Sequence, residues 1–165
     1  MPAWFYRVND MDSLTFGRIE TLVPHRGGMR LVDRVLEVDD DHVLAEVDVP
    51  FDGLFVRDGE VPSWVGIEYM AQAVAAWAGA RAQRQGAAGP RPGLLLGTRR
   101  YEAHCGGFAS GSRLRVEARC EFIAGNGLGQ FDCRIVQDGR ELAVARISVM
   151  DPSDEALALL RGEER

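Results

Sequence analysis

The sequence contains few cysteines, and it has no excess of positive charge. Among its 165 residues are three cysteines, Cys105, Cys120 and Cys133, without close pairing or metal-ligand spacing. This sparse, odd set is typical of a reducing compartment, in which we expect Cys120 and Cys133 to be small core residues. The formal net charge of -6 disfavours binding to nucleic acid or to an anionic membrane surface. We therefore expect neither as a partner.

Other signals are also absent. The N-terminus has no basic segment followed by a long apolar run, so we expect no secretory signal and a cytoplasmic location. A Gly-x-Ser-x-Gly nucleophile motif is missing, and the three histidines do not have the spacing of metal ligands. We expect no metal and no other cofactor.

The most informative segment is an apolar stretch from Ser63 to Ala80. After Ser63, only Glu68 and Gln72 carry a strongly polar group, and a helix that is apolar on every face is buried. Ser63 is the expected N-cap, and Glu68 is expected in the second turn with Gln72 on the same face. A carboxylate in such a helix is paired, hydrogen-bonded or functional, so a structural and a catalytic Glu68 both remain open. The run is too short, and too polar at Glu68, for a membrane span.

Segments with strand character lie on both sides of this helix. The predicted strands cover residues 30–38, 42–49, 93–103, 113–124, 130–136 and 141–150. Short helices are predicted for residues 13–23 and 153–160. This order predicts an α+β fold in which a six-stranded antiparallel sheet, in meander order, curls round helix 63–85. We expect an N-terminal arm (1–12), one domain (13–150) and a C-terminal helix and tail (151–165), with a second subunit covering the helix and joining its sheet edge to edge.

Two stretches resemble the hotdog-fold 3-hydroxyacyl-[acyl carrier protein] dehydratases. The first is Leu22-Val-Pro-His-Arg-Gly-Gly-Met-Arg-Leu-Val-Asp-Arg-Val35, which is similar to a Pro-His-Arg loop running into a Leu-Val-Asp-Arg-Val strand. The second is Val65-Gly-Ile-Glu-Tyr-Met-Ala-Gln-Ala73, which is similar to the start of the family's central helix. More narrowly, the chain resembles the divergent branch of this family that is found in aryl polyene clusters.

The resemblance implies removal of water from a 3-hydroxyacyl thioester carried by the phosphopantetheine arm of an acyl carrier protein. Such a reaction needs a base at the carbon beside the carbonyl, an acid at the hydroxyl, and dipoles facing the thioester oxygen. The resemblance assigns Glu68 to the hydroxyl of the substrate and the backbone amides of residues 63–66 to its thioester carbonyl. The substrate-binding residues expected from it are Leu54, Phe55, Ser63, Trp64, Gly66 and Gln72.

The sequence departs from this family in the loop before the helix. Where the family carries its catalytic histidine, this chain has Leu54, which cannot take a proton. His104 is the first candidate for a replacement base and His25 the second, although each also has a structural interpretation. His25 belongs to the Pro-His-Arg loop, and His104 ends the first strand after the helix.

Three functions follow. The first is a dehydratase that acts, as a homodimer or a heterodimer with another hotdog protein, on acyl thioesters in fatty-acid or polyketide-type lipid biosynthesis. The second is a non-catalytic partner subunit of a dehydratase heterodimer, which Leu54 favours. The third is a hotdog acyl thioesterase, in which Glu68 would activate water or attack the thioester.

Overall fold

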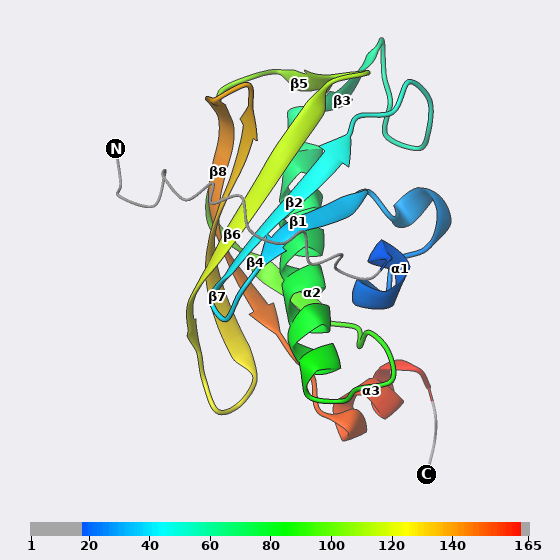
Figure 1. The fold of residues 1–165 in the computed structure, drawn as a ribbon, viewed down its shortest axis with the longest axis vertical. Helices are drawn as coiled ribbons and strands as arrows, with labels where there is room; N and C mark the ends of the chain where they lie inside the picture. Colours follow the sequence, from blue (N-terminus) through cyan, green and yellow to red (C-terminus); the bar gives the residue numbers. More distant parts are fainter. Residues whose placement is uncertain (1–17, 163–165) are drawn as a thin grey trace.

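A curved antiparallel sheet wraps round one long helix in the computed structural model, which describes residues 18–162 (Figure 1). The helix, α2 (Gly66–Arg84), follows a 3-10 turn, η3 (Ser63–Val65). This arrangement confirms the predicted α+β hotdog fold. The predicted Ser63 N-cap is wrong, because no side chain caps either helical start. Since α2 begins at Gly66, Glu68 lies in its first turn and not in its second.

The main sheet has six strands, as predicted, but not in meander order. Its order is β1-β2-β6-β7-β8-β4. The strands are β1 (Arg34–Val38), β2 (His42–Asp48), β6 (Arg113–Ile123), β7 (Leu128–Gln137), β8 (Arg140–Met150) and β4 (Leu94–Ala103). The chain leaves α2 and enters β4 at the far edge, where β8 is its one partner among the described strands. The hairpin β1–β2 therefore forms one edge and β4 forms the other.

A second, two-stranded sheet joins two segments for which no strand was predicted. β3 (Glu60–Pro62) pairs with β5 (Gly107–Ala109) immediately before the helical start. Ser63 N also donates to Gly106 O at 3.2 Å. This small sheet therefore fixes the chain just before α2.

The first part of the predicted strand 30–38 is not a strand. Residues Gly27–Met29 form a 3-10 turn, η2, and β1 begins only at Arg34. The short helix α1 (Ile19–Leu22) precedes this loop. The predicted arm 1–12 and the first part of the predicted helix 13–23 lie outside the described residues. At the other end, α3 (Asp154–Leu160) is capped by Ser153, whose hydroxyl accepts from Ala156 N.

The core lies between α2 and the concave face of the sheet. Trp77 of α2 meets Phe131 of β7 edge to face, with ring centroids 5.2 Å apart, and Tyr69 packs on Phe108 of β5. Gly79 lets α1 approach closely, because a Cβ at this position would overlap the backbone of Leu22. Large aromatic contacts of this kind dominate core stabilisation.

Residues 18–162 leave one face of α2 and of the turn before it uncovered. Trp64 is 63% exposed, Ala78 is exposed, and Ala71 and Ala75 between them are half-buried. Along residues 18–162, no helix is both long and apolar enough to cross a membrane. The open face is the side of the helix for which we expected a second subunit.

Candidate functional site

Glu68 stands at the start of α2 with its carboxylate within reach of solvent. The side chain is 34% exposed in the single chain, so it is less buried than we expected for an apolar helix. Its Oε1 accepts a hydrogen bond from Gln72 Nε2 at 2.9 Å. The first turn of a helix favours a carboxylate electrostatically, through the exposed amide dipoles. Glu68 is therefore held in place and still accessible.

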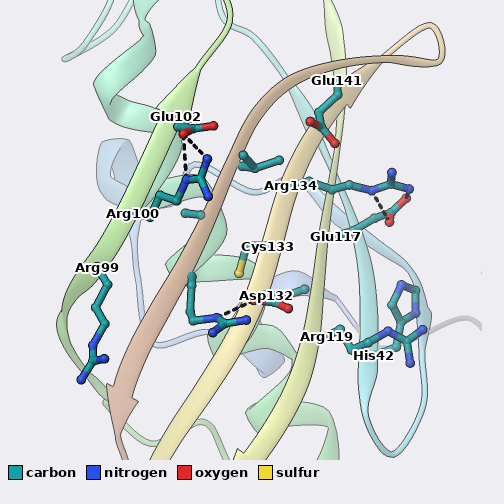
Figure 2. Close-up of a pocket in the computed structure, with 14 residues that line it drawn as sticks. His42, Arg99, Arg100, Glu102, Glu117, Arg119, Asp132, Cys133, Arg134 and Glu141 are labelled. Carbon is teal, nitrogen blue, oxygen red and sulfur yellow. Dashed lines mark hydrogen bonds and ion pairs between the residues drawn. The ribbon is translucent and has the colours of Figure 1, made fainter. Parts of the chain in front are cut away.

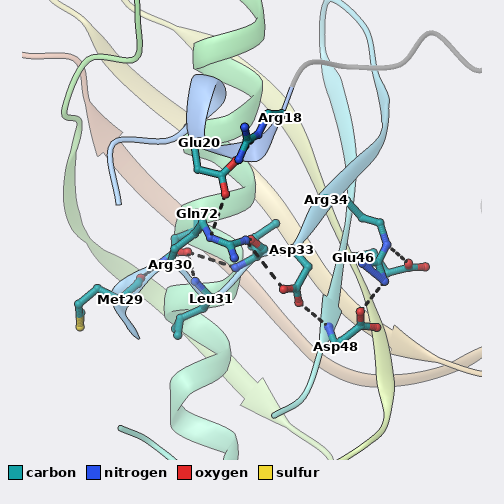
Figure 3. Close-up of polar contacts among 11 residues, drawn as sticks. Arg18, Glu20, Met29, Arg30, Leu31, Asp33, Arg34, Glu46, Asp48 and Gln72 are labelled. Carbon is teal, nitrogen blue, oxygen red and sulfur yellow. Dashed lines mark hydrogen bonds and ion pairs between the residues drawn. The ribbon is translucent and has the colours of Figure 1, made fainter. Parts of the chain in front are cut away.

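Gln72 connects Glu68 to the loop that carries His25. Figure 3 shows Gln72 beside Met29 and Leu31 of that loop. Its Nε2 also donates to Met29 O at 2.8 Å. Its Oε1 accepts from Leu31 N at 2.8 Å and from Val32 N at 3.3 Å. The residue is fully buried, and both polar atoms of its side chain are used within the chain. Substrate binding by Gln72 stays a prediction; within the chain, its side chain holds Glu68 and the loop together.

The Leu-Val-Asp-Arg part of the same motif is held by the neighbouring strand. Asp33 Oδ2 accepts from Asp48 N at 2.7 Å, and burial raises the pKa of Asp33. Arg34 donates to Glu46 at 2.7 Å and to Asp48 at 2.6 Å. These contacts attach the loop to β2, so the loop is fixed from two directions (Figure 3).

His25 is the histidine that the structure brings to Glu68. His25 Nε2 lies 3.6 Å from Glu68 Oε1, which is ion-pair distance but longer than a hydrogen bond. The side chain is 29% exposed, but its Nδ1 is buried without a hydrogen-bond partner among the described residues. His25, the second of the two histidine candidates, is therefore the one that lies at ion-pair distance from Glu68 in the single chain.

His104 and Leu54 occupy other positions. His104 Nε2 lies 3.7 Å from Glu141 Oε1, and nearly half of its side chain is exposed. Within residues 18–162, no ion pair joins His104 to Glu68, so the single chain gives no support to our first-ranked replacement base. Leu54 lies in the loop before β3 and is 57% exposed. An apolar side chain so exposed is available to a ligand or to another subunit.

Apolar and aromatic side chains lie near the start of α2. Trp64 is one helical turn before Glu68, and its ring meets Phe55 edge to face at 6.1 Å. Met29, whose carbonyl binds Gln72, is 46% exposed. Exposed apolar groups beside a carboxylate could bind the part of an acyl chain that is close to its reacting carbons.

The turn before α2 is positioned by a tyrosine that sequence reasoning missed. Tyr101 of β4 donates from its hydroxyl to Ser63 O, and burial raises the pKa of Tyr101 to about 12. A Cβ on Gly66 would overlap this hydroxyl and press on Ile135 and Phe108. Packing therefore favours glycine at position 66, independently of any ligand that the Gly66 backbone amide binds. The sequence carried no signal for Tyr101, because β4 was expected beside other strands.

A separate hollow lies on the sheet face away from α2 (Figure 2). Its volume is about 600 Å³, and none of the predicted site residues lines it. Cross-strand ion pairs cover its floor, including Arg134–Glu117 at 2.8 Å and Arg146–Asp132 at 3.0 Å. Because these charges neutralise one another across neighbouring strands, we place the candidate chemistry at Glu68 and not in this hollow.

Comparison with known proteins points to one family. A model of the ApeP-like family, described as ApeP dehydratase, matches residues 17–161. Among solved structures, the dehydratase heterocomplex ApeI:P from Xenorhabdus doucetiae is similar at 30% sequence identity with a TM-score of 0.79. The match covers 87% of this chain and 97% of that chain.

More distant structures share the fold alone. The PaaI protein of the phenylacetic acid degradation operon of E. coli matches at 13% identity with a TM-score of 0.55, covering 71% of this chain and 81% of that one. Cj0977, a virulence protein from Campylobacter jejuni, matches at 11% identity with a TM-score of 0.59, covering 83% and 86%. No curated protein matches the sequence.

Proposed function

This chain belongs to the ApeP-like dehydratase family, and from that premise we propose that it is one half of a heterodimeric dehydratase that removes water from 3-hydroxyacyl thioesters. The observation that carries the proposal is the Glu68 carboxylate, positioned by Gln72 at 2.9 Å, accessible, and next to exposed apolar side chains. In this proposal the acyl group arrives on the phosphopantetheine arm of an acyl carrier protein.

Glu68 serves the hydroxyl in the proposed reaction. A base takes the proton from the carbon beside the thioester carbonyl, and the electron pair forms the new carbon–carbon double bond. The bond to the hydroxyl breaks, and the hydroxyl leaves as water with a proton from the Glu68 carboxyl group. Gln72 keeps one carboxylate oxygen occupied, which leaves the other to face the substrate.

His25 assists Glu68 in this proposal and is not the opposing base. An acid and a base that work on adjacent carbons each approach their own atom to about 2.6–3.2 Å. His25 Nε2 lies only 3.6 Å from Glu68 Oε1, so no substrate carbon fits between them. His25 can instead exchange a proton with Glu68 between turnovers. The base at the other carbon must then come from elsewhere.

A second hotdog subunit is the source of that base in our proposal. The family position for it is Leu54 in this chain. His25 lies too close to Glu68, and the ion pair of His104 within residues 18–162 is with Glu141. The uncovered face of α2 and the open edge of β4 give such a subunit a place to bind. ApeI:P, the similar structure, is itself a dehydratase heterocomplex.

The test is a dehydration assay with a 3-hydroxyacyl carrier protein. The chain is assayed alone, and then with each hotdog protein encoded beside it. We expect turnover only in the mixture, and loss of that turnover when Glu68 is replaced by Gln in this chain. Full turnover by the chain alone would disprove the need for a partner. Full turnover by a mixture with Glu68→Gln would remove Glu68 from the chemistry.

A further inference from the structure

Two adjacent arginines lie at the centre of the open sheet edge. β4 is the last strand in the sheet order and pairs with β8 on one side only, within the described residues. Arg99 and Arg100 are the sixth and seventh of its ten residues, Leu94–Ala103. Both are exposed. The edge offers backbone groups to another strand, and the register of β4 on β8 shifts between Leu95 and Gly97 and between Thr98 and Arg100, on either side of Arg99.

The charge of this edge is only partly balanced. Arg100 donates from Nε to Glu102 Oε1 at 2.7 Å, so these two side chains neutralise each other. Arg99 has neither an ion pair nor a side-chain hydrogen bond to any residue from 18 to 162, and Figure 2 shows its side chain pointing away from the cross-strand ion pairs. The centre of the edge is therefore positive, although the whole chain carries a net charge of -6.

Symmetry makes this charge unfavourable for pairing with a second copy. A two-fold axis that passes through the middle of two identical edge strands places the middle of each strand against the middle of the other. Arg99 and Arg100 of both copies would then be cross-strand or diagonal neighbours, where like charges are destabilising. The only carboxylate within the strand, Glu102, is already paired with Arg100.

The same edge also carries apolar surface. Leu94, Leu95 and Leu96 are 38%, 40% and 54% exposed. Covering consecutive leucines favours association with any hotdog edge, since burial of apolar area is not selective. The arginines are the part of this edge that can distinguish one partner from another.

We propose that Arg99 and Arg100 select a partner subunit whose matching edge strand carries carboxylates at its centre, and that they disfavour a homodimer of this chain. This inference rests on the proposed heterodimer and deepens it, because it states which chemistry the partner must present. Arginine and carboxylate across two paired strands form charge-assisted contacts. A second copy of the chain offers only more arginine.

The test needs no knowledge of the natural partner, because a charge-reversed copy of the chain can replace it. Wild type, Arg99→Glu, and the double variant Arg99→Glu/Arg100→Glu are purified, together with Arg115→Glu as the control. Arg115 is an exposed arginine on the interior strand β6, so the control reverses one charge, as Arg99→Glu does, without touching the edge. Circular dichroism confirms that each variant is folded.

Association is measured by sedimentation at micromolar concentration, in low and in high salt. We expect the mixture of wild type with the double variant to dimerise at least about tenfold more tightly than either protein alone. Salt should weaken this mixed dimer and strengthen self-association of wild type, because screening acts on attraction and repulsion alike. Mixtures of wild type with Arg115→Glu should behave as wild type alone.

Arg99→Glu keeps the inference testable if loss of the Arg100–Glu102 pair unfolds the double variant. The carboxylate that it introduces would face Arg100 of a second copy, so this variant should self-associate more tightly than wild type. The inference would be overturned if wild type alone, or its mixture with Arg115→Glu, dimerised as tightly as the mixture of wild type with the double variant. It would also be overturned if no mixture formed a dimer. The measurement involves no thioester, so its failure is distinct from a failure of the dehydration assay.

Discussion

Gln72 Nε2 donates to Glu68 Oε1 at 2.9 Å and, from the same nitrogen, to the carbonyl of Met29 at 2.8 Å. One buried amide therefore sets the position of the candidate catalytic carboxylate relative to the loop that carries His25. The pair is spaced by one helical turn, so the helix alone brings the two side chains together. The loop is then added by hydrogen bonds to its backbone.

We predict that Gln72→Leu lowers the free energy of unfolding by about 2–4 kcal/mol, because the amides of Leu31 and Val32 lose their acceptor in a buried place. Chemical denaturation measures this loss. Gln83→Leu is the matched control on the same helix, since Gln83 Nε2 also donates to a backbone carbonyl, that of Thr21, but in an exposed position. An equal loss in both variants would show that the Gln72 network adds no particular stability.

Glu68→Gln should leave the fold intact and remove the chemistry. The amide oxygen that replaces Oε1 can still accept from Gln72, so we expect a change in unfolding free energy within about 1 kcal/mol. Turnover in the heterodimer should fall by about a hundredfold to ten-thousandfold, the usual contribution of a general acid or base. Glu37→Gln, at an exposed carboxylate on β1, is the control and should keep its turnover. A large loss of stability in Glu68→Gln with turnover retained would make Glu68 a structural residue.

Local patterns were enough to predict the helix, the six strands and the shared face of Glu68 and Gln72. These predictions rest on hydrophobic periodicity and on turn residues, which are signals that extend over only a few positions. They could not predict that β4 crosses to the far edge, because the choice between neighbours in a sheet depends on contacts distant in sequence. The expected meander failed for this reason.

The choice between His25 and His104 also depended on long-range contacts. His25 reaches Glu68 because Gln72, forty-one residues from Leu31 in sequence, anchors the loop onto α2. No local pattern around His25 contains that information. Tyr101 was missed in the same way, since its hydroxyl meets Ser63 only after β4 and the helical start have come together. The sequence could therefore identify the carboxylate and its helical neighbour Gln72, but not the contacts that come from distant parts of the chain.

Gly66 and Tyr101 should be coupled in stability. Gly66→Ala places a methyl group against the Tyr101 hydroxyl, and overpacking of this kind costs about 1–3 kcal/mol. Tyr101→Phe alone loses one hydrogen bond to Ser63 O, worth about 0.5–1.5 kcal/mol. The double variant should be less destabilised than the sum of the two, because removing the hydroxyl makes room for the methyl group. A double-mutant cycle from denaturation curves measures this coupling, and strict additivity would contradict the contact.

Acid should weaken the contact between β2 and its neighbours at Asp48. A hydrogen bond from Arg113, aided by the charge of Arg34, holds the pKa of Asp48 below its ordinary value of 3.8. A carboxyl with a lowered pKa in the folded state adds stability above its ordinary pKa, and this stability is lost as the pH falls through the folded pKa. Asp48→Asn should therefore be less stable than wild type at neutral pH, and the difference in Tm should shrink below pH 3.8. Asp52→Asn, at an exposed loop position, is the matched control, and the same change of Tm with pH in both variants would contradict the role given to Asp48.

The last prediction concerns the missing base at Leu54. A histidine there should be tolerated, because Leu54 is 57% exposed and surface substitutions usually change stability by no more than about 0.5 kcal/mol. If the chain lacks only this base, Leu54→His should bring dehydration to copies that pair with each other.

Pairing is the condition for that gain, so Leu54→His is best made together with Arg99→Glu, which we expect to promote self-association. The variant that combines Leu54→His with Arg99→Glu should dehydrate a 3-hydroxyacyl carrier protein at a rate about a hundredfold or more above that of Arg99→Glu alone. Leu54→Gln with Arg99→Glu is the control, since glutamine is polar and of similar size but cannot act as a base. Activity with Leu54→His and not with Leu54→Gln would show that Glu68 and its surroundings remain competent. A dimeric, folded and inert Leu54→His variant would show that the chain has lost more than one catalytic group, and that both the base and its setting must come from the partner subunit.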